Sequence, residues 1–383
     1  MKFYLAPLEG ITGYVFRNAV HEQFGLGIDK YFTPFIEPHP HKKCMTNRAL
    51  NDIVPEHNQD VNVVPQILTN NAEAYLFAER EIAPYGYREI NLNLGCPSAT
   101  VTTKFRGAGL LRDCDRLDAM LQGIFAETEC EVSVKTRIGF ESPDEWPAIL
   151  DIYNKYPLKE LIIHPRVRNE FYAGALHYDA VRYALNNTDF AVCYNGDINS
   201  VAAFERVMNI LGEGNCRRLP DSVMTGRGMV RNPKLISALY AHINACTDGN
   251  GRNADAALES RHLASTDSST VYLNDAVNAA AGVDIDVVRL DCGPSSSRIA
   301  ASESEFSSLT SMELRTFTDA LLEGYGELLS GDMPVLHKMK EVWSWLILGI
   351  PNHDRLLKKL TKSKTMSEYK AAVDDIVRSC PAV

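Results

Sequence analysis

The feature that most constrains the fold is an alternation of short apolar runs with longer helical patterns over residues 1–246. Eight runs rich in β-branched residues end in or beside Gly, Pro, Asn or His: Lys2–Ala6, Lys30–Phe35, Asn62–Leu68, Glu89–Leu94, Glu131–Thr136, Glu160–His164, Phe190–Tyr194 and Ser222–Thr225. Near-continuous apolar runs are typical of strands covered on both faces. A doubly wound sheet would show the same alternation, but eight units in this length favour an α/β fold of the (β/α)8 TIM-barrel type.

Composition divides the chain into three parts. Residues 1–246 carry the barrel pattern, with helices expected over Ala72–Ile82, Asp115–Ala126, Glu145–Tyr156 and Val201–Leu211. Residues 247–311 are rich in Ala, Ser, Asp and Asn and hold ten acidic and four basic residues, which predicts an insertion or linker. Residues 312–383 return to a helical period and predict a smaller C-terminal helical bundle, with helices over Glu313–Leu329, Met333–Leu348, Arg355–Thr361 and Met366–Val377.

Charge and cysteine usage exclude several classes. The net charge of −10 argues against a generic nucleic-acid-binding protein, although much of the acidic excess falls in residues 247–311. The nine cysteines contain no CxxC pair, so we expect neither a disulfide framework nor a metal site, and a reducing cytoplasm is the expected location. No apolar stretch is long enough for a signal peptide or a membrane helix, so no membrane association is expected.

Polar residues stand at or just after the ends of most of the predicted strands. In a TIM barrel the carboxyl ends of all strands meet at one mouth, which is where such enzymes hold their active sites. We therefore expect one site built from Pro7, Leu8, Glu9, Gln66, Asn93, Cys96, Lys135, His164, Arg166, Asn195, Gly196, Asp197, Gly226 and Arg227.

The chemistry of these residues suggests a bound phosphate and a flavin. Gly226, Arg227 and Gly196 end the seventh and eighth runs, where many barrels bind phosphate through backbone N–H groups and an arginine. A flavin needs a positive charge near its pyrimidine edge, a role that Lys135 fits, and His164 could contact its ring or its phosphate. For each residue alone, a turn, a salt bridge or a structural hydrogen bond is the more common role.

Cys96 is the most informative of these residues. It lies between Gly95 and Pro97, on a tight turn at the expected mouth rather than inside a packed run. A thiol with a reference pKa of about 8.5 is mostly protonated at neutral pH, so it can act as a proton donor. The other cysteines lack this arrangement and are interpreted as structural.

Several spaced motifs resemble the tRNA-dihydrouridine synthases. The central one is Ile90–Ser98 (INLNLGCPS), followed by Val101, Lys104 and Gly107–Leu111. The others are Ala6–Gly10, Val134–Arg137, Asn195–Ile198, Thr225–Gly228 with Asn232 and Pro233, and His337–Trp343 in the helical tail. The resemblance covers about residues 1–246 and 312–350, with the motifs in the family's order.

The resemblance implies an enzyme that reduces specific uridines in tRNA to 5,6-dihydrouridine. FMN would be bound by Pro7, Leu8, Glu9, Gln66, Lys135, His164, Asn195, Gly196, Asp197, Gly226 and Arg227, and NADPH or NADH would reduce it. Cys96 would be the general acid. The substrate contacts would be Asn93, Lys104 and Arg166, with Lys338 and Lys340 of a tRNA-binding tail.

Two departures and two alternatives accompany this interpretation. The family usually has Met at Leu8, a change of little consequence, and Gly at Pro165, where proline removes a backbone donor beside His164. One alternative is a flavin-dependent reductase of a small pyrimidine, of the dihydroorotate or dihydropyrimidine type. The basic helical tail favours tRNA over a free base. The other alternative is a tRNA-binding protein without catalysis, against which the intact Cys96 and Lys135 argue.

Overall fold

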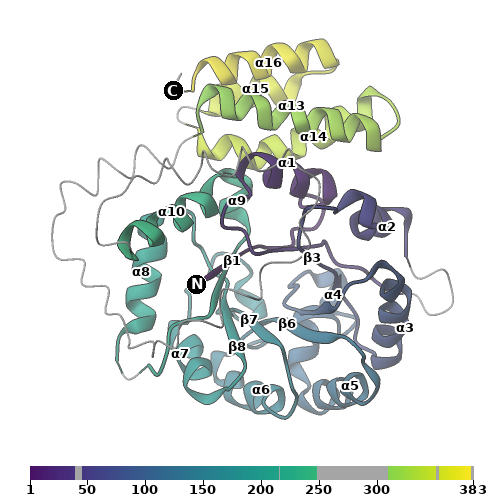
Figure 1. Cartoon of the computed structure of the whole chain (residues 1–383), viewed down its shortest axis with the longest axis vertical. Coiled ribbons are helices and arrows are strands. Elements are labelled where there is room, and N and C mark those ends of the chain that lie inside the picture. Colours follow the sequence, from purple (N-terminus) through teal and green to yellow (C-terminus); the bar gives the residue numbers. More distant parts are fainter. Residues whose placement is uncertain (39–44, 215, 248–308, 351–352, 381–383) are drawn as a thin grey trace, which may run out of the picture.

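The computed structural model describes residues 1–38, 45–214, 216–247, 309–350 and 353–380. Within these residues one sheet of nine parallel strands has the order β3-β2-β1-β9-β8-β7-β6-β5-β4. The strands are β1 (Lys2–Leu5), β2 (Lys30–Phe32), β3 (Val63–Val64), β4 (Gln66–Ile67), β5 (Glu89–Leu94), β6 (Glu131–Arg137), β7 (Glu160–His164), β8 (Ala191–Tyr194) and β9 (Ser222–Thr225). The helices that follow most strands surround this sheet, which confirms the predicted TIM barrel (Figure 1).

The barrel closes at Pro65, which divides the third predicted strand into β3 and β4. Proline has no N–H to donate to a ladder, so the strand is interrupted at this residue. On one side β3 pairs with β2, and on the other β4 pairs with β5, so the two end strands of the sheet are parts of one segment. The Pro65 carbonyl still accepts a hydrogen bond from the Asn91 N–H at 2.9 Å. The prediction of one continuous strand over Asn62–Leu68 was therefore wrong in this detail.

The outer helices match the predicted periodicity. They are α1 (Tyr14–Phe24), α2 (Asn47–Ile53), α3 (Ala72–Ile82), α4 (Ala99–Thr102), α5 (Cys114–Glu127), α6 (Trp146–Tyr153), α7 (Tyr178–Asn187), α8 (Val201–Gly212), α9 (Arg227–Arg231) and α10 (Leu235–Thr247). Their starts follow from capping chemistry: Asn71, Asp113 and Ser200 each accept a backbone N–H from the first turn of α3, α5 and α8.

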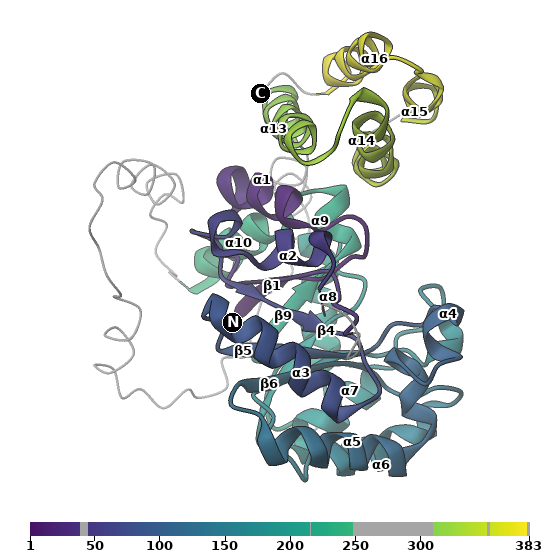
Figure 2. The same cartoon turned by 90° about the vertical axis from the view of Figure 1, so that its right-hand side faces the viewer.

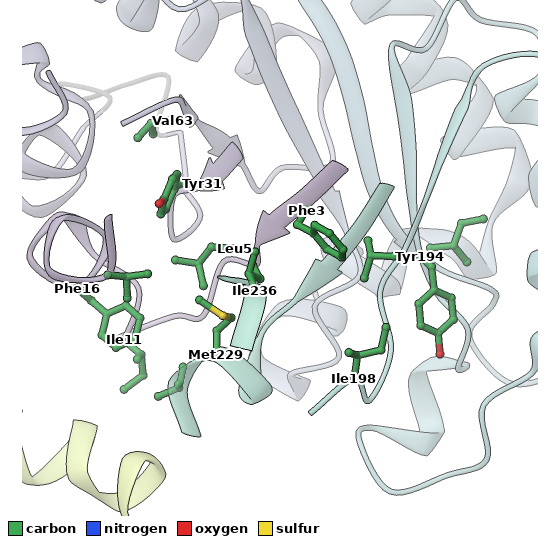
Figure 3. Close-up of a cluster of buried hydrophobic side chains, with 14 of the residues drawn as sticks. Phe3, Leu5, Ile11, Phe16, Tyr31, Val63, Tyr194, Ile198, Met229 and Ile236 are labelled. Carbon is green, nitrogen blue, oxygen red and sulfur yellow. The ribbon is translucent and has the colours of Figure 1, made fainter. Parts of the chain in front are cut away.

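Alternation along each strand separates two buried clusters. Phe3 and Leu5 of β1 face the outer helices and join a large core that includes Phe16 of α1 and Ile236 of α10 (Figure 3). The intervening inward residues fill one sector of the barrel interior, namely Tyr4, Ala6, Phe32, Val64, Ile162, Cys193 and Met224. The remaining sector, under β4 to β6, is polar and is described below.

The C-terminal helices pack on the α1 and α9 side of the barrel (Figures 1 and 2). They are α13 (Ser311–Leu328), α14 (Asp332–Leu346), α15 (His353–Lys362) and α16 (Met366–Arg378). Phe317 of α13 meets Phe16 of α1 edge to face, with ring centroids 5.7 Å apart. Gly324 permits a close approach, because a Cβ there would lie 2.7 Å from Val15 Cγ1. The predicted 247–311 insertion lies outside the described residues except at its ends.

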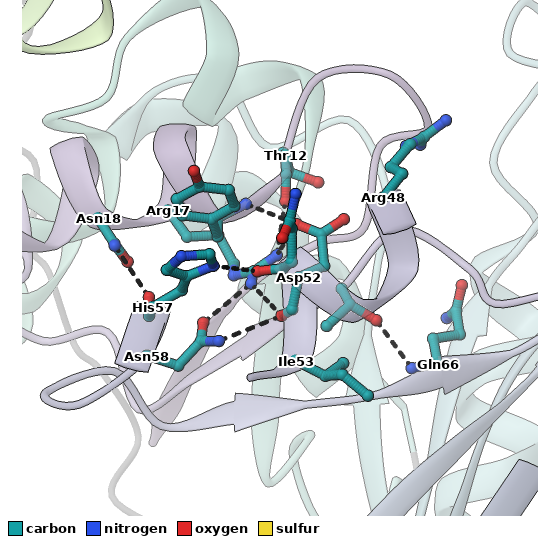
Figure 4. A network of polar contacts seen from close by, with 12 residues as sticks. Thr12, Arg17, Asn18, Arg48, Asp52, Ile53, His57, Asn58 and Gln66 are labelled. Carbon is teal, nitrogen blue, oxygen red and sulfur yellow. Dashed lines mark hydrogen bonds and ion pairs between the residues drawn. The ribbon is translucent and has the colours of Figure 1, made fainter. Parts of the chain in front are cut away.

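A buried polar network supports the loop between β1 and α1 (Figure 4). The Arg17 guanidinium, fully buried, donates to the Thr12 carbonyl at 3.0 Å and to Asn58 Oδ1 at 2.9 Å. It also donates to the Asp52 carbonyl at 2.7 Å and pairs with the Asp52 carboxylate at 3.4 Å. In the part of the chain that the structure describes, no helix is long and apolar enough to cross a membrane.

Candidate active site

A cavity of about 400 Å³ opens at the carboxyl ends of the strands. The structure brings together in its lining all the residues expected to hold a cofactor, together with Asn93 and Cys96. The lining residues that belong to this expected set are Pro7, Leu8, Glu9, Gln66, Asn93, Cys96, Lys135, His164, Asn195, Gly196, Asp197, Gly226 and Arg227. They come from distant parts of the sequence and meet because the strands are parallel and closed.

The turn that carries Cys96 is held from several directions. The Asn93 side-chain oxygen accepts the N–H groups of Gly95 and Cys96, each at 3.0 Å. The Arg137 Nε donates to the Gly95 carbonyl at 2.9 Å. Gly107 packs beneath the turn with a φ of 53°, and a Cβ there would lie 2.8 Å from the Cys96 carbonyl oxygen. Burial raises the pKa of the Cys96 thiol above its ordinary value, so the sulfur keeps its proton at neutral pH.

The wall beside this turn, formed by β6 and β7, is positively charged. Burial, followed by the nearby Arg137 charge, lowers the pKa of the Lys135 ammonium to about 8. Burial also lowers the pKa of the Arg137 guanidinium to about 10, which leaves it charged at neutral pH. His164 is 7% exposed, and burial together with the charges of Arg137 and Lys135 holds its pKa well below its ordinary value. His164 is therefore a neutral imidazole that lies among cations.

Asp197 organises the end of the cavity formed after β8 and β9. Its carboxylate pairs with Arg166 and with Arg227, each at 2.5 Å. Burial alone would raise the pKa of Asp197, but the hydrogen bonds and charges of Arg166 and Arg227 hold it below its ordinary value. Arg166 also contacts Nε2 of His164 at 3.3 Å, which favours the tautomer with the proton on Nδ1. The carboxylate thus fixes the direction of Arg227, whose side chain lines the cavity.

Tyr172 forms an aromatic part of the rim. Its ring lies 5.2 Å from the Arg137 guanidinium carbon, 4.9 Å from that of Arg227, and 6.1 Å from the His164 ring. The side chain is 49% exposed, and it follows Phe171, whose φ is 50°. Two guanidinium groups therefore hold an exposed ring beside the cavity without covering it.

Four residues expected to contact the substrate do not line the cavity. Arg166 is buried behind the wall, where its donors reach Asp197, His164 and the Gly174 carbonyl. Lys338 bonds to the Gly10 carbonyl and lies 3.0 Å from Glu341, and Lys340 bonds to the Ser363 carbonyl. Lys104 is exposed on the segment after α4. Both tail lysines are thus engaged within the chain.

Sequence reasoning assigned no role to several lining residues, namely Arg137, Tyr172, Thr225 and Arg231. One signal was available for Arg137, because residues two apart on a strand share a face and Lys135 was already a candidate. Tyr172 lies in a loop, where no periodicity marks direction. Thr225 Oγ1 and Arg231 Nε are buried, and in the described structure neither has a hydrogen-bond partner.

Comparisons with known proteins identify the family of this chain. A family model described as "Dihydrouridine synthase (Dus)" matches residues 4–276. A probable tRNA-dihydrouridine synthase of Staphylococcus aureus strain Mu50 is 30% identical over 240 residues, which are 60% of this chain and 69% of that protein. The tRNA-dihydrouridine synthase B of Pasteurella multocida is 26% identical over 243 residues, 63% of this chain and 70% of that protein. These matches show that the chain belongs to the dihydrouridine synthase (Dus) family.

Proposed function

We propose that this chain reduces specific uridines in tRNA to 5,6-dihydrouridine, using FMN and NADPH or NADH, with Cys96 as the general acid. The observation that carries the proposal is the partly buried Cys96 thiol at the mouth of the barrel, in one cavity with Lys135 and the glycine and arginine residues after β8 and β9; burial raises its pKa. A thiol that stays protonated at neutral pH is suited to donating a proton to a ring carbon.

The donors of the cavity fit a flavin mononucleotide. Its phosphate requires cations and backbone donors, which Arg227, Arg231 and the segment at Gly226 would supply. Gly226 permits a close approach to the end of β1, because a Cβ there would lie 3.3 Å from the Ala6 Cβ. Thr225 Oγ1 and Arg231 Nε belong to residues that line this end of the cavity and have no hydrogen-bond partner in the described structure, so a polar ligand there would supply one.

The ring end of such a ligand would meet Gln66 and Lys135, with Asn93 left beside the substrate. Amides can follow a ring edge that alternates donors and acceptors, and the Lys135 ammonium would stabilise negative charge at that edge. When bound and reduced by NADPH or NADH, FMN would supply the hydride that reduces the 5,6 double bond of uracil.

Cys96 would then deliver the second hydrogen. Hydride addition at carbon 6 leaves negative charge on carbon 5 and the neighbouring carbonyl, and the thiol proton would pass to carbon 5. The sulfur becomes a thiolate, and the charges of Arg137 and Lys135, which already act to lower the Cys96 pKa, would stabilise it. Burial keeps the proton in place before the reaction, and the cations lower the cost of losing it.

A base must leave its stack in the tRNA before it can reach this cavity. Tyr172, held by Arg137 and Arg227, offers a ring face at the rim on which a base can stack. The tail would contact the RNA backbone through the exposed side chains of Arg355, Lys358, Lys362 and Lys364, because Lys338 and Lys340 are engaged within the chain.

The test is a dihydrouridine assay with a matched pair of variants. Unmodified tRNA is incubated with NADPH and the protein, and digested fragments are weighed for uridines heavier by two hydrogens. Cys96→Ala should bind FMN and oxidise NADPH but leave tRNA unmodified, whereas Cys114→Ala, which lies outside the cavity, should behave as the parent protein. Full modification by Cys96→Ala would remove the acid role. Inert tRNA with turnover of free uracil or dihydroorotate would favour the small-pyrimidine alternative.

A further inference from the structure

The barrel interior contains a polar layer where TIM barrels ordinarily pack branched aliphatic side chains. Gln66, Asn91 and Ser133 are fully buried and lie side by side on β4, β5 and β6, with Asn91 in register with both neighbours. Asn93 lies two residues further along β5, on the same face and next to the cavity. Burying three polar side chains is costly unless each is bonded, so this layer calls for an explanation.

The four side chains form one directed chain of hydrogen bonds. Asn93 Nδ2 donates to Gln66 Oε1 at 2.8 Å. Gln66 Nε2 donates to Asn91 Oδ1 at 2.7 Å, and Asn91 Nδ2 donates to Ser133 Oγ at 2.9 Å. The chain begins at the cavity and ends at a hydroxyl in the barrel interior.

Its direction is set by two backbone groups. The N–H groups of Gly95 and Cys96 can only donate, so the Asn93 atom that faces them must be its oxygen. Asn93 must therefore present its nitrogen to Gln66. Each later amide is then oriented by the one before it, because two donors or two acceptors cannot face each other. Reversing the Gln66 amide would leave buried groups unsatisfied on both sides, and reversing the Asn91 amide would set two nitrogens against each other on its Gln66 side.

We propose that Asn91 and Ser133 are positioning residues: they hold Gln66 in place by completing its hydrogen bonds, and Gln66 in turn keeps the Asn93 side chain, and with it the turn that carries Cys96, in one position. Neither Asn91 nor Ser133 lines the cavity, so neither would touch a ligand there. Their effect would reach the thiol only through the Asn93 oxygen and the two N–H groups that it accepts.

The same chain fixes what Asn93 can offer a substrate. Its oxygen already accepts two N–H groups, which occupy both lone pairs, so only the second hydrogen of its nitrogen is left for a ligand. Asn93 would thus select an acceptor, such as a ring carbonyl oxygen of uracil, and would disfavour an amino group at that position. This part of the inference rests on the proposed function.

The first test measures Cys96 directly, without RNA. Full-length protein is treated with iodoacetamide between pH 7 and 9, and alkylation of the Cys96 peptide is followed by mass spectrometry. Ser133→Ala removes the terminal acceptor and should loosen the turn. Burial raises the pKa of the Cys96 thiol. If the loosened turn lowers that pKa by about half a unit, the thiolate fraction at a pH below the pKa rises about threefold, and the rate of alkylation rises with it. Ser133→Thr keeps the hydroxyl and should restore the parent rate.

Cys193→Ala is the matched control, since it also removes one buried atom from the barrel interior but lies in the apolar sector. It should leave Cys96 alkylation unchanged. Asn91→Ala breaks the chain one step earlier and gives a second variant should Ser133→Ala fail to fold. Parent-like Cys96 alkylation in a folded Ser133→Ala or Asn91→Ala protein would overturn the proposal.

A second test separates the inference from the proposed function. With tRNA and NADPH, both variants should lose kcat for dihydrouridine formation by about tenfold or more, while the rate of NADPH oxidation without RNA stays the same. If the parent protein does not modify tRNA but the Ser133 and Asn91 variants still change Cys96 alkylation, the positioning chain is supported and the proposed function is refuted. An equal loss of dihydrouridine formation and of NADPH oxidation without RNA would indicate general destabilisation and overturn the positioning role.

Discussion

Replacing Arg17 with methionine should destabilise the protein by about 3–5 kcal/mol, the usual cost of breaking a buried ion pair by removing one partner. Methionine approximates the volume of the arginine stem, so the loss is mainly polar. The Asp52 side chain would remain 7% exposed, with its carboxylate bonded to the Tyr14 N–H at 2.6 Å but facing no cation. The Thr12 carbonyl and Asn58 Oδ1 would also lose their donor.

Urea and thermal denaturation would measure this loss, which corresponds to a fall in Tm of about 4–6 °C for a chain of this size. Arg116→Met is the control, because Arg116 pairs with Asp113 at the surface with 61% of its side chain exposed, and such pairs contribute about 0–1 kcal/mol. Adding Asp52→Asn to Arg17→Met should recover much of the stability, since it removes the uncompensated charge but keeps an acceptor for Tyr14. A loss below about 1 kcal/mol in the single variant would refute the argument from buried charge.

Three further predictions concern the cavity. FMN affinity should fall about tenfold as the pH rises from 7 to 9, because Lys135 has a pKa of about 8 and loses its positive charge in this range. Flavin fluorescence titrations measure this affinity, and Lys135→Met should show no change with pH. Tyr172→Ala should raise the KM for tRNA about tenfold, and Tyr172→Phe should keep the parent value in steady-state kinetics, because stacking needs only the ring. Lys338→Met should weaken FMN binding by a few-fold, because it removes the donor to the Gly10 carbonyl and loosens the loop that carries Pro7. Equilibrium dialysis measures this change; unchanged FMN affinity would mean that the tail acts on RNA alone.

Periodicity predicted the barrel well because its strands are buried on both faces. The predicted runs Glu89–Leu94, Glu160–His164 and Ser222–Thr225 coincide with β5, β7 and β9. Leu161–Ile163 of β7 are aliphatic without a break, whereas β5 alternates aliphatic residues with Asn91 and Asn93; in both strands the limits are visible in the sequence. The third strand was the exception: Pro65 lies within an apolar run, and its missing N–H divides a segment that hydropathy alone joins.

The position of the site followed from topology, whereas the partners of its charges did not. Parallel strands must end at one mouth, so every residue expected at a cofactor lies in one cavity. Charge alone could not tell whether a lysine faces solvent or a carbonyl inside the chain. Lys338 and Lys340 were chosen for their charge, yet each bonds to a backbone carbonyl of a distant segment. Only tertiary packing determines that choice.

These contacts make the first loop of the barrel a point where three parts of the molecule meet. Leu8 N–H donates to the Thr12 hydroxyl at 2.7 Å within the loop, and Glu9 pairs with Arg48 of α2 at 2.6 Å. The Gly10 carbonyl accepts from Lys338 of α14 in the tail. Because Pro7, Leu8 and Glu9 line the cavity, a shift of the tail would be transmitted to the cavity wall through Gly10. RNA binding by the tail would thus also shift the wall of the proposed flavin site, and the change in FMN affinity of Lys338→Met measures the strength of this coupling.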